Sequence, residues 1–307
     1  MKTRVSTRRQ LLAQAARSGA LLSLLGFLTP SFGADTPPHD ASLIVFMSDF
    51  GTLDDAVAIC KGVMKSIAPH SEIIDLTHQV TPYSIADGAR MLGRTAQYYP
   101  SGTVFVAVVD PGVGTRRKSI ILKTRRSQYF VLPDNGLATE VADRDGVEGV
   151  REITNPRWLL TGSSSTTFHG RDVFSPVAAH IARGDDWTQA GPTLATYVRL
   201  DVPRAHLEPV GIRGMVVALD GSYGNLVTNV SGDAFRELGY ELGDSVRVQL
   251  GSTTLSVPFQ RTFGEVAPGR PLLFVDSRGM VSLAINQGNF AQQYRVTPPV
   301  ALVIPRK

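Results

Sequence analysis

The sequence has little cysteine, few aromatic residues and few charges. One cysteine, Cys60, occurs among 307 residues, which excludes an intrachain disulfide framework even in an oxidising compartment. Charged residues make up 19% and apolar residues 43% of the chain, so it is not a disordered or fibrous protein. Internal repeats and low-complexity tracts are also missing. The length suits one large globular domain or two ordinary ones.

Residues 1–34 predict a signal peptide. They contain five basic residues and no acidic one, followed by an apolar run from Ala20 to Leu28. This run is too short for a bilayer, which needs about 20 residues. We expect cleavage after Ala34 or Gly33, a flexible mature N-terminus over residues 35–41, and no stable membrane span once the leader is removed.

The sequence Thr7-Arg8-Arg9-Gln10-Leu11-Leu12 resembles a twin-arginine export signal, which carries folded proteins out of the bacterial cytoplasm. The alternative is an ordinary secretory leader with two adjacent arginines. Either leader predicts a periplasmic or secreted bacterial protein. Without the leader's five cations the net charge falls from +4 to −1, so the basic balance gives no reason to expect a nucleic-acid partner.

From Ser42 onward the pattern predicts an α/β domain over residues 42–195, with a mainly parallel sheet covered by helices on both faces. Apolar runs predict strands, and helix-period segments alternate with them. The expected strands are Leu43–Met47, Ile73–Leu76, Thr103–Val109, Ile120–Lys123 and Tyr129–Leu132, and the expected helices are Asp54–Ile67, Ser84–Tyr98, Leu137–Val141 and Val173–Ala182.

A linker over residues 196–209 is expected to lead into a small C-terminal β-barrel domain over residues 210–307. The apolar runs there are short, alternate with polar residues and are separated by turn residues, which is typical of a barrel. The expected strands are Gly214–Leu219, Leu226–Val230, Ser245–Leu250, Pro271–Val275, Met280–Ile285 and Val300–Ile304.

Two polar segments follow strands of the predicted parallel sheet, where ligands bind in open α/β folds. Asp49 follows the first strand beside a glycine, and its carboxylate could accept hydrogen bonds from both hydroxyls of a ribose. Asp110 follows the third strand and opens the turn Asp110-Pro-Gly-Val-Gly-Thr-Arg-Arg117. Both aspartates could instead serve as helix caps or turn residues, and Arg116 and Arg117 could be solvated surface charges.

Other polar segments have similar alternatives. His169 lies in Thr166-Thr-Phe-His-Gly-Arg-Asp172, before a predicted helix, and a single histidine is more often structural than catalytic. The segment Asp220-Gly-Ser-Tyr-Gly-Asn-Leu-Val-Thr-Asn229 and the turn Ser277-Arg278-Gly279 could be hairpin turns. Phe263 could be a core residue.

Together these segments resemble the S-adenosylmethionine (SAM) hydroxide adenosyltransferases, the hydrolytic relatives of the fluorinases and chlorinases. The resemblance extends from about Leu43 to Asn286, through Ser-Asp-Phe-Gly-Thr-Leu-Asp-Asp, Thr-Pro-Tyr, Asp-Pro-Gly-Val-Gly-Thr, Pro-Asp-Asn-Gly-Leu, Phe-His-Gly-Arg-Asp, Gly-Asn-Leu-Val-Thr-Asn and Ser-Arg-Gly. It implies an α/β domain joined to a β-barrel, and a homotrimer with active sites between subunits.

The resemblance places the family's hydrolytic triad on Asp110, Arg117 and His169. Fluorinases have tyrosines in place of Asp110 and His169, and a long insertion where this chain has only Arg125 to Gln128. A buried carboxylate repels halide, so the site is expected to favour water.

The remaining roles are also implied by the resemblance. Asp49 would bind the ribose hydroxyls, with Tyr83 and Phe168 as aromatic walls. In the second domain Tyr223 and Phe263 would stack on the adenine and Asn225 would contact its edge. Asp220, Ser277 and Arg278 would hold the methionine ammonium and carboxylate groups. Ile285 stands where halogenases often have arginine.

The expected reaction is hydrolysis of SAM at the ribose C5′ to adenosine and methionine, without a cofactor or metal. Arg117 and His169 would orient a water whose proton Asp110 takes or shares, and the formal base stays open. One alternative is a calcium-dependent nucleosidase, because Asp49, Asp54 and Asp55 are similar to its aspartate-rich opening. Here, however, Ser48 precedes Asp49 and the spacing is one residue longer. The other alternative is a non-catalytic periplasmic protein that binds an adenosyl ligand.

Overall fold

A computed structural model describes residues 42–161 and 165–307. The predicted signal peptide at residues 1–34 and the predicted flexible segment at residues 35–41 both lie outside these described residues. None of the helices in the described part of the chain is both long and apolar enough to span a bilayer.

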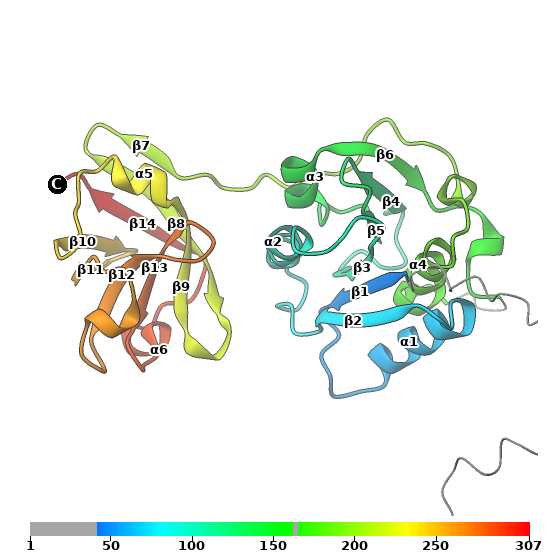
Figure 1. The fold of residues 1–307 in the computed structure, drawn as a ribbon, viewed down its shortest axis with the longest axis horizontal. Coiled ribbons are helices and arrows are strands. Elements are labelled where there is room, and N and C mark those ends of the chain that lie inside the picture. The colour runs from blue at the N-terminus through cyan, green and yellow to red at the C-terminus, as the bar shows by residue number, and fades with distance from the viewer. Residues whose placement is uncertain (1–41, 162–164) are drawn as a thin grey trace, which may run out of the picture. The chain divides into compact units, whose positions relative to one another are not determined.

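The N-terminal sheet has six strands in the order β2-β1-β3-β5-β4-β6 (Figure 1). The strands β2, β1, β3 and β5 pair in parallel, whereas β4 pairs antiparallel with β5 and β6. The sheet is therefore mainly parallel, as predicted. Its strands are β1 (Leu43–Ser48), β2 (Glu72–Thr77), β3 (Val104–Val108), β4 (Ser119–Thr124), β5 (Tyr129–Pro133) and β6 (Val147–Glu152).

Helices cover both faces of this sheet. They are α1 (Ala56–Ile67), α2 (Ile85–Ala96), α3 (Thr139–Asp145) and α4 (Ser175–Ala182), with short 3-10 turns at Pro156–Trp158 and Trp187–Ala190. Successive residues of a strand point to opposite faces. Accordingly Ile44 and Phe46 pack with α1 and α4, while Val45 and Met47 pack with α2 and α3. Buried apolar side chains on both faces explain why the central strands are almost uniformly apolar.

Several boundaries in this domain differ from those predicted. Helix α1 begins at Ala56 rather than Asp54, because the Asp54 side chain accepts a hydrogen bond from the Ala56 N–H and so precedes the first turn. Helix α3 covers Thr139–Asp145 rather than residues 137–141. Strand β6 was not predicted, since it alternates Val147 and Val150 with polar or small residues at the edge of the sheet.

The C-terminal part forms an antiparallel sheet with the order β11-β10-β14-β8-β9-β13-β12, and β7 pairs with β8. An isolated bridge between Phe259 and Leu273 links its two ends, so the sheet is a nearly closed barrel. This confirms the predicted class of an α/β domain followed by a β-barrel. The strands are β7 (His206–Glu208), β8 (Gly211–Asp220), β9 (Asn225–Ser231), β10 (Ser245–Leu250), β11 (Thr253–Pro258), β12 (Pro271–Val275), β13 (Met280–Ile285) and β14 (Val300–Pro305).

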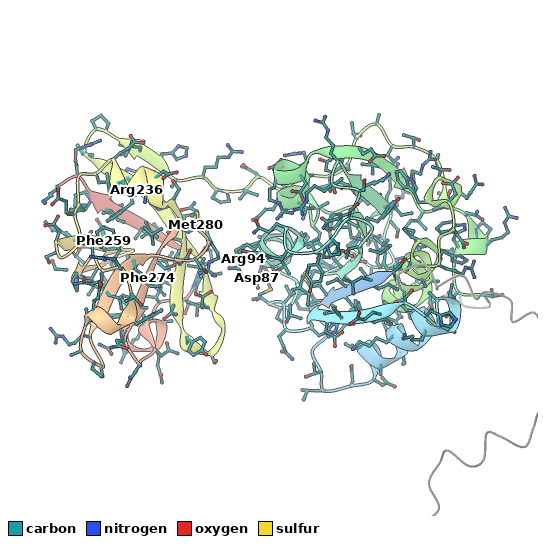
Figure 2. The ribbon with its side chains drawn as sticks, in the orientation of Figure 1. Asp87, Arg94, Arg236, Phe259, Phe274 and Met280 are labelled. Carbon is teal, nitrogen blue, oxygen red and sulfur yellow. The ribbon has the colours of Figure 1, made fainter. Side chains whose placement is uncertain are left out.

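Apolar side chains fill this barrel, and short helices lie against it. Phe235 of α5 (Gly232–Arg236) meets Phe259 edge-to-face at 5.0 Å between ring centroids. Phe290 of α6 (Phe290–Tyr294) is fully buried in the same core. Figure 2 shows Phe259, Phe274 and Met280 among the side chains of this part, with Arg236 on α5. The pattern missed both helices, β7 and β11, because each is short or lies at an edge of the sheet.

Candidate active site

The carboxyl ends of β1 and β3 bring two predicted site residues to one edge of the sheet. These strands pair in parallel with Ser48 opposite Val108, so Asp49 and the turn that begins at Asp110 follow neighbouring strands. The Asp49 N–H also donates to the Val108 carbonyl at 3.3 Å. The topology therefore places both carboxylates where ligands bind in open α/β sheets.

A pocket of about 400 Å³ lies at this edge. Its size is within the range of small-molecule sites. It joins the loop after β1, the turn before α2, the end of β3 and the segment that precedes α4. The lining residues are Asp49, Phe50, Pro82, Tyr83, Val108, Asp110, Val113, Thr167, Phe168, His169 and Gly170.

Arg117 forms a two-point ion pair with Asp110. Its Nε donates to Oδ1 at 3.1 Å and its Nη2 to Oδ2, while its Nη1 donates to the Lys118 carbonyl and to Ser119 Oγ, each at 2.8 Å. The Arg117 side chain is 8% exposed and that of Asp110 is 5% exposed. The guanidinium also lies 5.5 Å from the centre of the Phe174 ring. Arg117 is therefore held on several sides.

Arg117 also reaches His169, with 3.0 Å between Nη2 and Nδ1. A guanidinium only donates hydrogen bonds, so Nδ1 must be the acceptor. The imidazole then carries its proton on Nε2. Burial first, and then the charge of Arg117, lower the pKa of His169 below the ordinary value of 6.5, which favours the same neutral ring. His169 can thus offer an Nε2–H donor to a ligand in the pocket.

The backbone around His169 is a π-helical turn, Gly170–Phe174, which continues into α4. Such turns are rare in proteins overall, and those that occur are often found at functional sites. Position 170 requires a glycine, because an added Cβ would lie only 2.9 Å from Cζ of Phe50. Gly114 has φ +77° and approaches the Thr166 carbonyl so closely that a Cβ would lie 2.5 Å from its oxygen. These two contacts bring the His169 segment against the turns after β1 and β3.

Asp49 is bonded to the turn that carries Tyr83. The Tyr83 N–H donates to Asp49 Oδ2 at 2.9 Å, and Tyr83 has φ +65°, which is uncommon for an aromatic residue. The turn is anchored by Asp87 in α2, whose Oδ2 accepts from Thr81 Oγ1 at 2.9 Å; Figure 2 shows Asp87 in the N-terminal part. The Tyr83 ring is 75% exposed. Asp49 keeps lone pairs for a ligand, since a carboxylate has about four acceptor sites.

In the C-terminal part, Arg278 is paired with two carboxylates. It donates to both oxygens of Asp220, at 2.8 and 3.1 Å, and from Nε and Nη2 to Asp276 Oδ2. Four of its five N–H groups are directed at these partners, which leaves one N–H of Nη1 for a ligand. Asp276 was not predicted, although it directly precedes the Ser-Arg-Gly turn. Its Oδ2 also accepts from Ser282 Oγ at 2.9 Å.

The other predicted residues of this part lie in loops and at a strand end. Tyr223 precedes β9 and is 73% exposed, and Ser277 is exposed in the turn before β13. Phe263 lies between β11 and β12, 4.9 Å from Phe274 between ring centroids, and is 38% exposed. Asn225 begins β9, where it is buried opposite Asp220. The two aromatic rings are thus available to a flat ligand.

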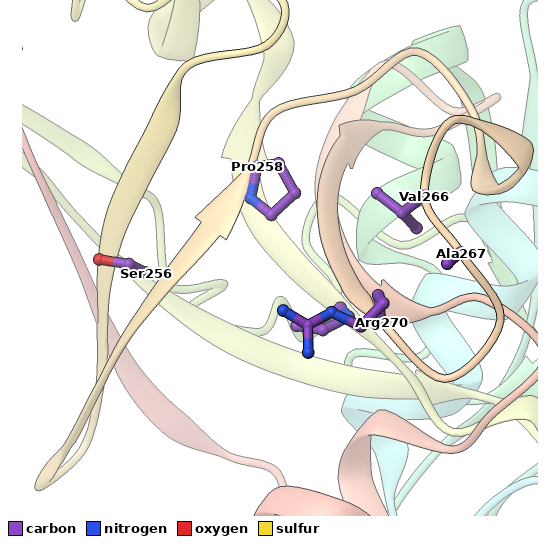
Figure 3. Close-up of a pocket in the computed structure, with 6 residues that line it drawn as sticks. Ser256, Pro258, Val266, Ala267 and Arg270 are labelled. Carbon is purple, nitrogen blue, oxygen red and sulfur yellow. The ribbon is translucent and has the colours of Figure 1, made fainter.

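A second hollow of about 330 Å³ lies on the C-terminal part (Figure 3). Figure 3 shows Pro258, Val266 and Arg270 around it, together with Ser256 and Ala267. Among the described residues that line it, Arg270 is the only ionisable one. It therefore lacks the set of acid, base and donor groups that surrounds the first pocket.

The aspartates of the nucleosidase alternative do not form a metal-ligating set. Asp54 and Asp55 are exposed before α1, and Asp54 accepts from its own helix. Within residues 42–161 and 165–307, no three His, Cys, Asp or Glu side chains are grouped so that they could hold an ion. The donor set for that alternative is therefore not assembled.

Some residues that line the pocket were not predicted as site residues, although they lie in or beside the family motifs. Phe50, Pro82, Thr167 and Gly170 neighbour predicted residues and line the pocket through their place in the turns. Val108 and Val113 supply apolar wall at the end of β3 and in the turn after it. The positions of Asp49 and Asp110 just after strands predicted that both belong to the site. Contacts made by apolar side chains leave no comparable signal in a single sequence.

Comparison with known proteins identifies both parts of the chain. Residues 44–191 match the SAM hydroxide adenosyltransferase N-terminal domain, and residues 214–301 match the corresponding C-terminal domain. The chain is 40% identical over 258 residues to the (R)-S-adenosyl-L-methionine hydrolase of Salinispora arenicola, covering 83% of this chain and 94% of that protein. It is 29% identical over 297 residues to the fluorinase of an Actinoplanes species, covering 88% and 99%.

A solved structure has the same fold. The crystal structure of an uncharacterized conserved protein from Thermotoga maritima superposes with a TM-score of 0.81 at 39% identity, and covers 85% of this chain and 99% of that one.

Proposed function

The chain belongs to the SAM hydroxide adenosyltransferase family, and we propose that it is a SAM hydrolase, which directs water at the ribose C5′ and releases adenosine and L-methionine. The observation that carries this proposal is the buried chain of contacts from Asp110 through Arg117 to His169 at one pocket. Relatives 36 to 40% identical from Salinispora arenicola and Thermus thermophilus carry the name (R)-S-adenosyl-L-methionine hydrolase.

The leaving group of this reaction needs little help from the protein. The sulfonium departs as a neutral thioether, so a general acid is not needed, and the main requirement is a nucleophile in line with the C5′–S bond. One lone pair of a water forms the new O–C5′ bond while the C5′–S electrons stay on sulfur. The water then loses one proton, so a nearby base must accept it.

The triad supplies the complementary groups for such a water. His169 offers Nε2–H to one lone pair of the water, and an oxygen of Asp110 accepts its proton. Arg117 connects the two side chains and fixes their orientation. Because Nδ1 of His169 is already an acceptor for Arg117, Asp110 is the better base.

Asp49 would bind the two ribose hydroxyls, and Tyr83 and Phe168 would enclose the sugar. We assign the adenine to Tyr223, Phe263 and Asn225, and the methionine ammonium and carboxylate to Asp220, Ser277 and Arg278. Since Asp220 and Arg278 already pair with each other, they would bind the zwitterionic end of methionine as a preformed pair of opposite charges.

Three further features belong to the same proposal. The enzyme works without a metal or other cofactor, it forms a homotrimer with active sites between subunits, and its leader exports it to the periplasm or beyond. The apolar side chain of Leu53, fully exposed between β1 and α1, and the exposed ring of Tyr83, which lines the pocket, support an interface on this part of the chain. Mass measurement in solution tests the trimer, and N-terminal sequencing of the exported protein with an Arg8→Lys/Arg9→Lys variant tests the leader.

In the deciding experiment, the protein is incubated with SAM in ¹⁸O-labelled water. A chelator is added to remove metal ions, and halide is left out so that water is the available nucleophile. Adenosine that carries ¹⁸O at C5′, and whose formation stops in an Asp110→Asn variant, would establish water attack. Separated sulfonium epimers should be tested in parallel, because the relatives' name specifies the R form. Free adenine would instead indicate glycosidic cleavage, and intact substrate that remains bound would indicate a binding protein.

A further inference from the structure

A second line of polar residues lies next to the pocket and is not used in the proposed reaction. Ser48 Oγ and His78 Nδ1 are hydrogen-bonded at 2.7 Å, and His78 Nε2 lies 3.1 Å from Asp75 Oδ1. Asp75 Oδ2 accepts from Lys61 Nζ at 2.6 Å. The line therefore extends from the fully buried end of β1 to the surface of α1.

The order Ser, His, Asp resembles a hydrolytic triad, but Ser48 cannot act as a nucleophile here. Its side chain is 0% exposed, and its Oγ already accepts from the Phe50 N–H at 3.3 Å. Ser48 and His78 are also not among the residues that line the pocket. Any effect of Ser48 and His78 on the site must therefore act through the backbone segment that they hold in place.

That backbone carries Asp49. The His78 carbonyl accepts from the Gly51 N–H at 2.7 Å, and the Ser48 carbonyl accepts from the Val80 N–H at 3.4 Å. The His78 ring packs edge-on against Phe46, 4.7 Å between ring centroids. The turn over residues 48–51 is thus bonded to His78 through both its side chain and its main chain.

The outer part of the line acts on the His78 ring mainly through charge, since Nε2 lies within ion-pair distance of Asp75 without a hydrogen bond of good geometry. Burial acts to raise the pKa of Asp75, but the contacts with Lys61 and His78 outweigh it and lower the pKa. An ionised Asp75 between a lysine and the ring nitrogen favours a proton on Nε2 of His78. Nδ1 is then the acceptor for the Ser48 hydroxyl, whose lone pair remains directed at Phe50 N–H.

We propose that Ser48 and His78 are positioning residues, which fix the turn over residues 48–51 so that the Asp49 carboxylate is preorganised for the two ribose hydroxyl groups. This inference rests on the proposed role of Asp49. Asp75 and Lys61 support the ring and have a weaker effect, because their side chains are 42% and 33% exposed.

The test measures the Kd for adenosine, which contains the ribose but cannot react. Ser48→Ala should weaken binding about two- to tenfold, the value of one hydrogen bond. His78→Gln, which keeps an amide near the Nε2 position, should weaken binding similarly. His78→Asn keeps an amide near the Nδ1 position and should therefore retain most of the parent protein's affinity for adenosine. Thr103→Val is the matched control, since this buried hydroxyl donates to the Pro100 carbonyl just before β3, and its Kd should be unchanged.

A double-mutant cycle separates positioning from a general structural effect. In an Asp49→Asn background, Ser48→Ala should change the Kd by less than in the parent protein, because both act on one carboxylate. Equal effects in both backgrounds, or a folded Ser48→Ala variant with unaltered Kd, would overturn the inference. Unchanged binding by Asp49→Asn would also overturn it. Because no turnover is measured, these results are independent of whether water is the nucleophile.

Discussion

The Nη2 atom of Arg117 lies 3.0 Å from Nδ1 of His169. This contact requires a neutral imidazole, since a protonated ring would place an N–H against a guanidinium N–H. The same contact determines which nitrogen carries the proton.

The first prediction concerns the protonation of His169. We expect ¹⁵N-detected NMR to show the Nε2–H form at neutral pH, with a pKa below 6.5. With respect to His169, activity should therefore persist as the pH falls below 6.5 and decline when this ring is protonated. An acidic limb at or above 6.5 in kcat/KM, or an Nδ1–H form, would contradict the assignment.

The same pKa shift affects stability. The unfolded chain binds a proton on this histidine at a higher pH than the folded chain does. The contribution of His169 to folding is therefore fully present above 6.5, and it is lost as the pH falls from 6.5 to the folded pKa. A His169→Gln variant should lose this part of the pH dependence of Tm.

Asp110→Asn should reduce kcat by about 10²- to 10⁴-fold, the usual contribution of a positioned general base. The asparagine amide cannot take the proton from water, yet it nearly preserves the volume of the side chain. Binding of adenosine should change little, because Asp49 makes the ribose contacts. Asp233→Asn, which changes an exposed carboxylate on α5, provides the control. A kcat within a few-fold of the parent would show that another group is the base.

Breaking the Asp110–Arg117 pair should be costly to the fold. Both side chains are nearly fully buried, so Arg117→Gln alone should lower the free energy of unfolding by about 3–5 kcal/mol. Adding Asp110→Asn should recover part of that loss, because the uncompensated carboxylate is removed. Denaturant unfolding measures both. Arg213→Gln breaks an exposed pair with Glu208 and should cost less than about 1 kcal/mol.

The fold was predictable where burial is uniform. Val45 and Met47 on one face of β1, and Ile44 and Phe46 on the other, make the strand apolar throughout, and this pattern survives in a single sequence. The edge strands β6 and β11 were missed because only part of each is buried. Arg151 of β6 and Ser256 of β11 face outward or pair with loops, so the apolar signal is diluted.

The site was predictable only in part for a similar reason. Asp49 and Asp110 could be chosen because they follow strands, and topology then brings them to one edge. Arg117 and His169 are 52 residues apart, and only the family resemblance joined them before the structure did. Asp276, Ser48 and His78 were not predicted as site residues. Each acts by contacting another side chain, and such a contact produces no recognisable pattern in a single sequence.

The last prediction concerns Gly114, whose φ of +77° and contact with the Thr166 carbonyl connect the Asp110 turn to the His169 segment. Gly114→Ala should lower the free energy of unfolding by roughly 1–2 kcal/mol from the left-handed backbone alone. The Cβ should add about 1–3 kcal/mol through its overlap with the carbonyl. Gly102→Ala isolates the first effect, because Gly102 has φ +84° and an added Cβ meets nothing within 4 Å. Since relief of the overlap must displace Thr166, and His169 follows it closely, kcat should fall in Gly114→Ala and not in Gly102→Ala. Equal stability and equal kcat in the two variants would show that the close approach does not hold the triad together.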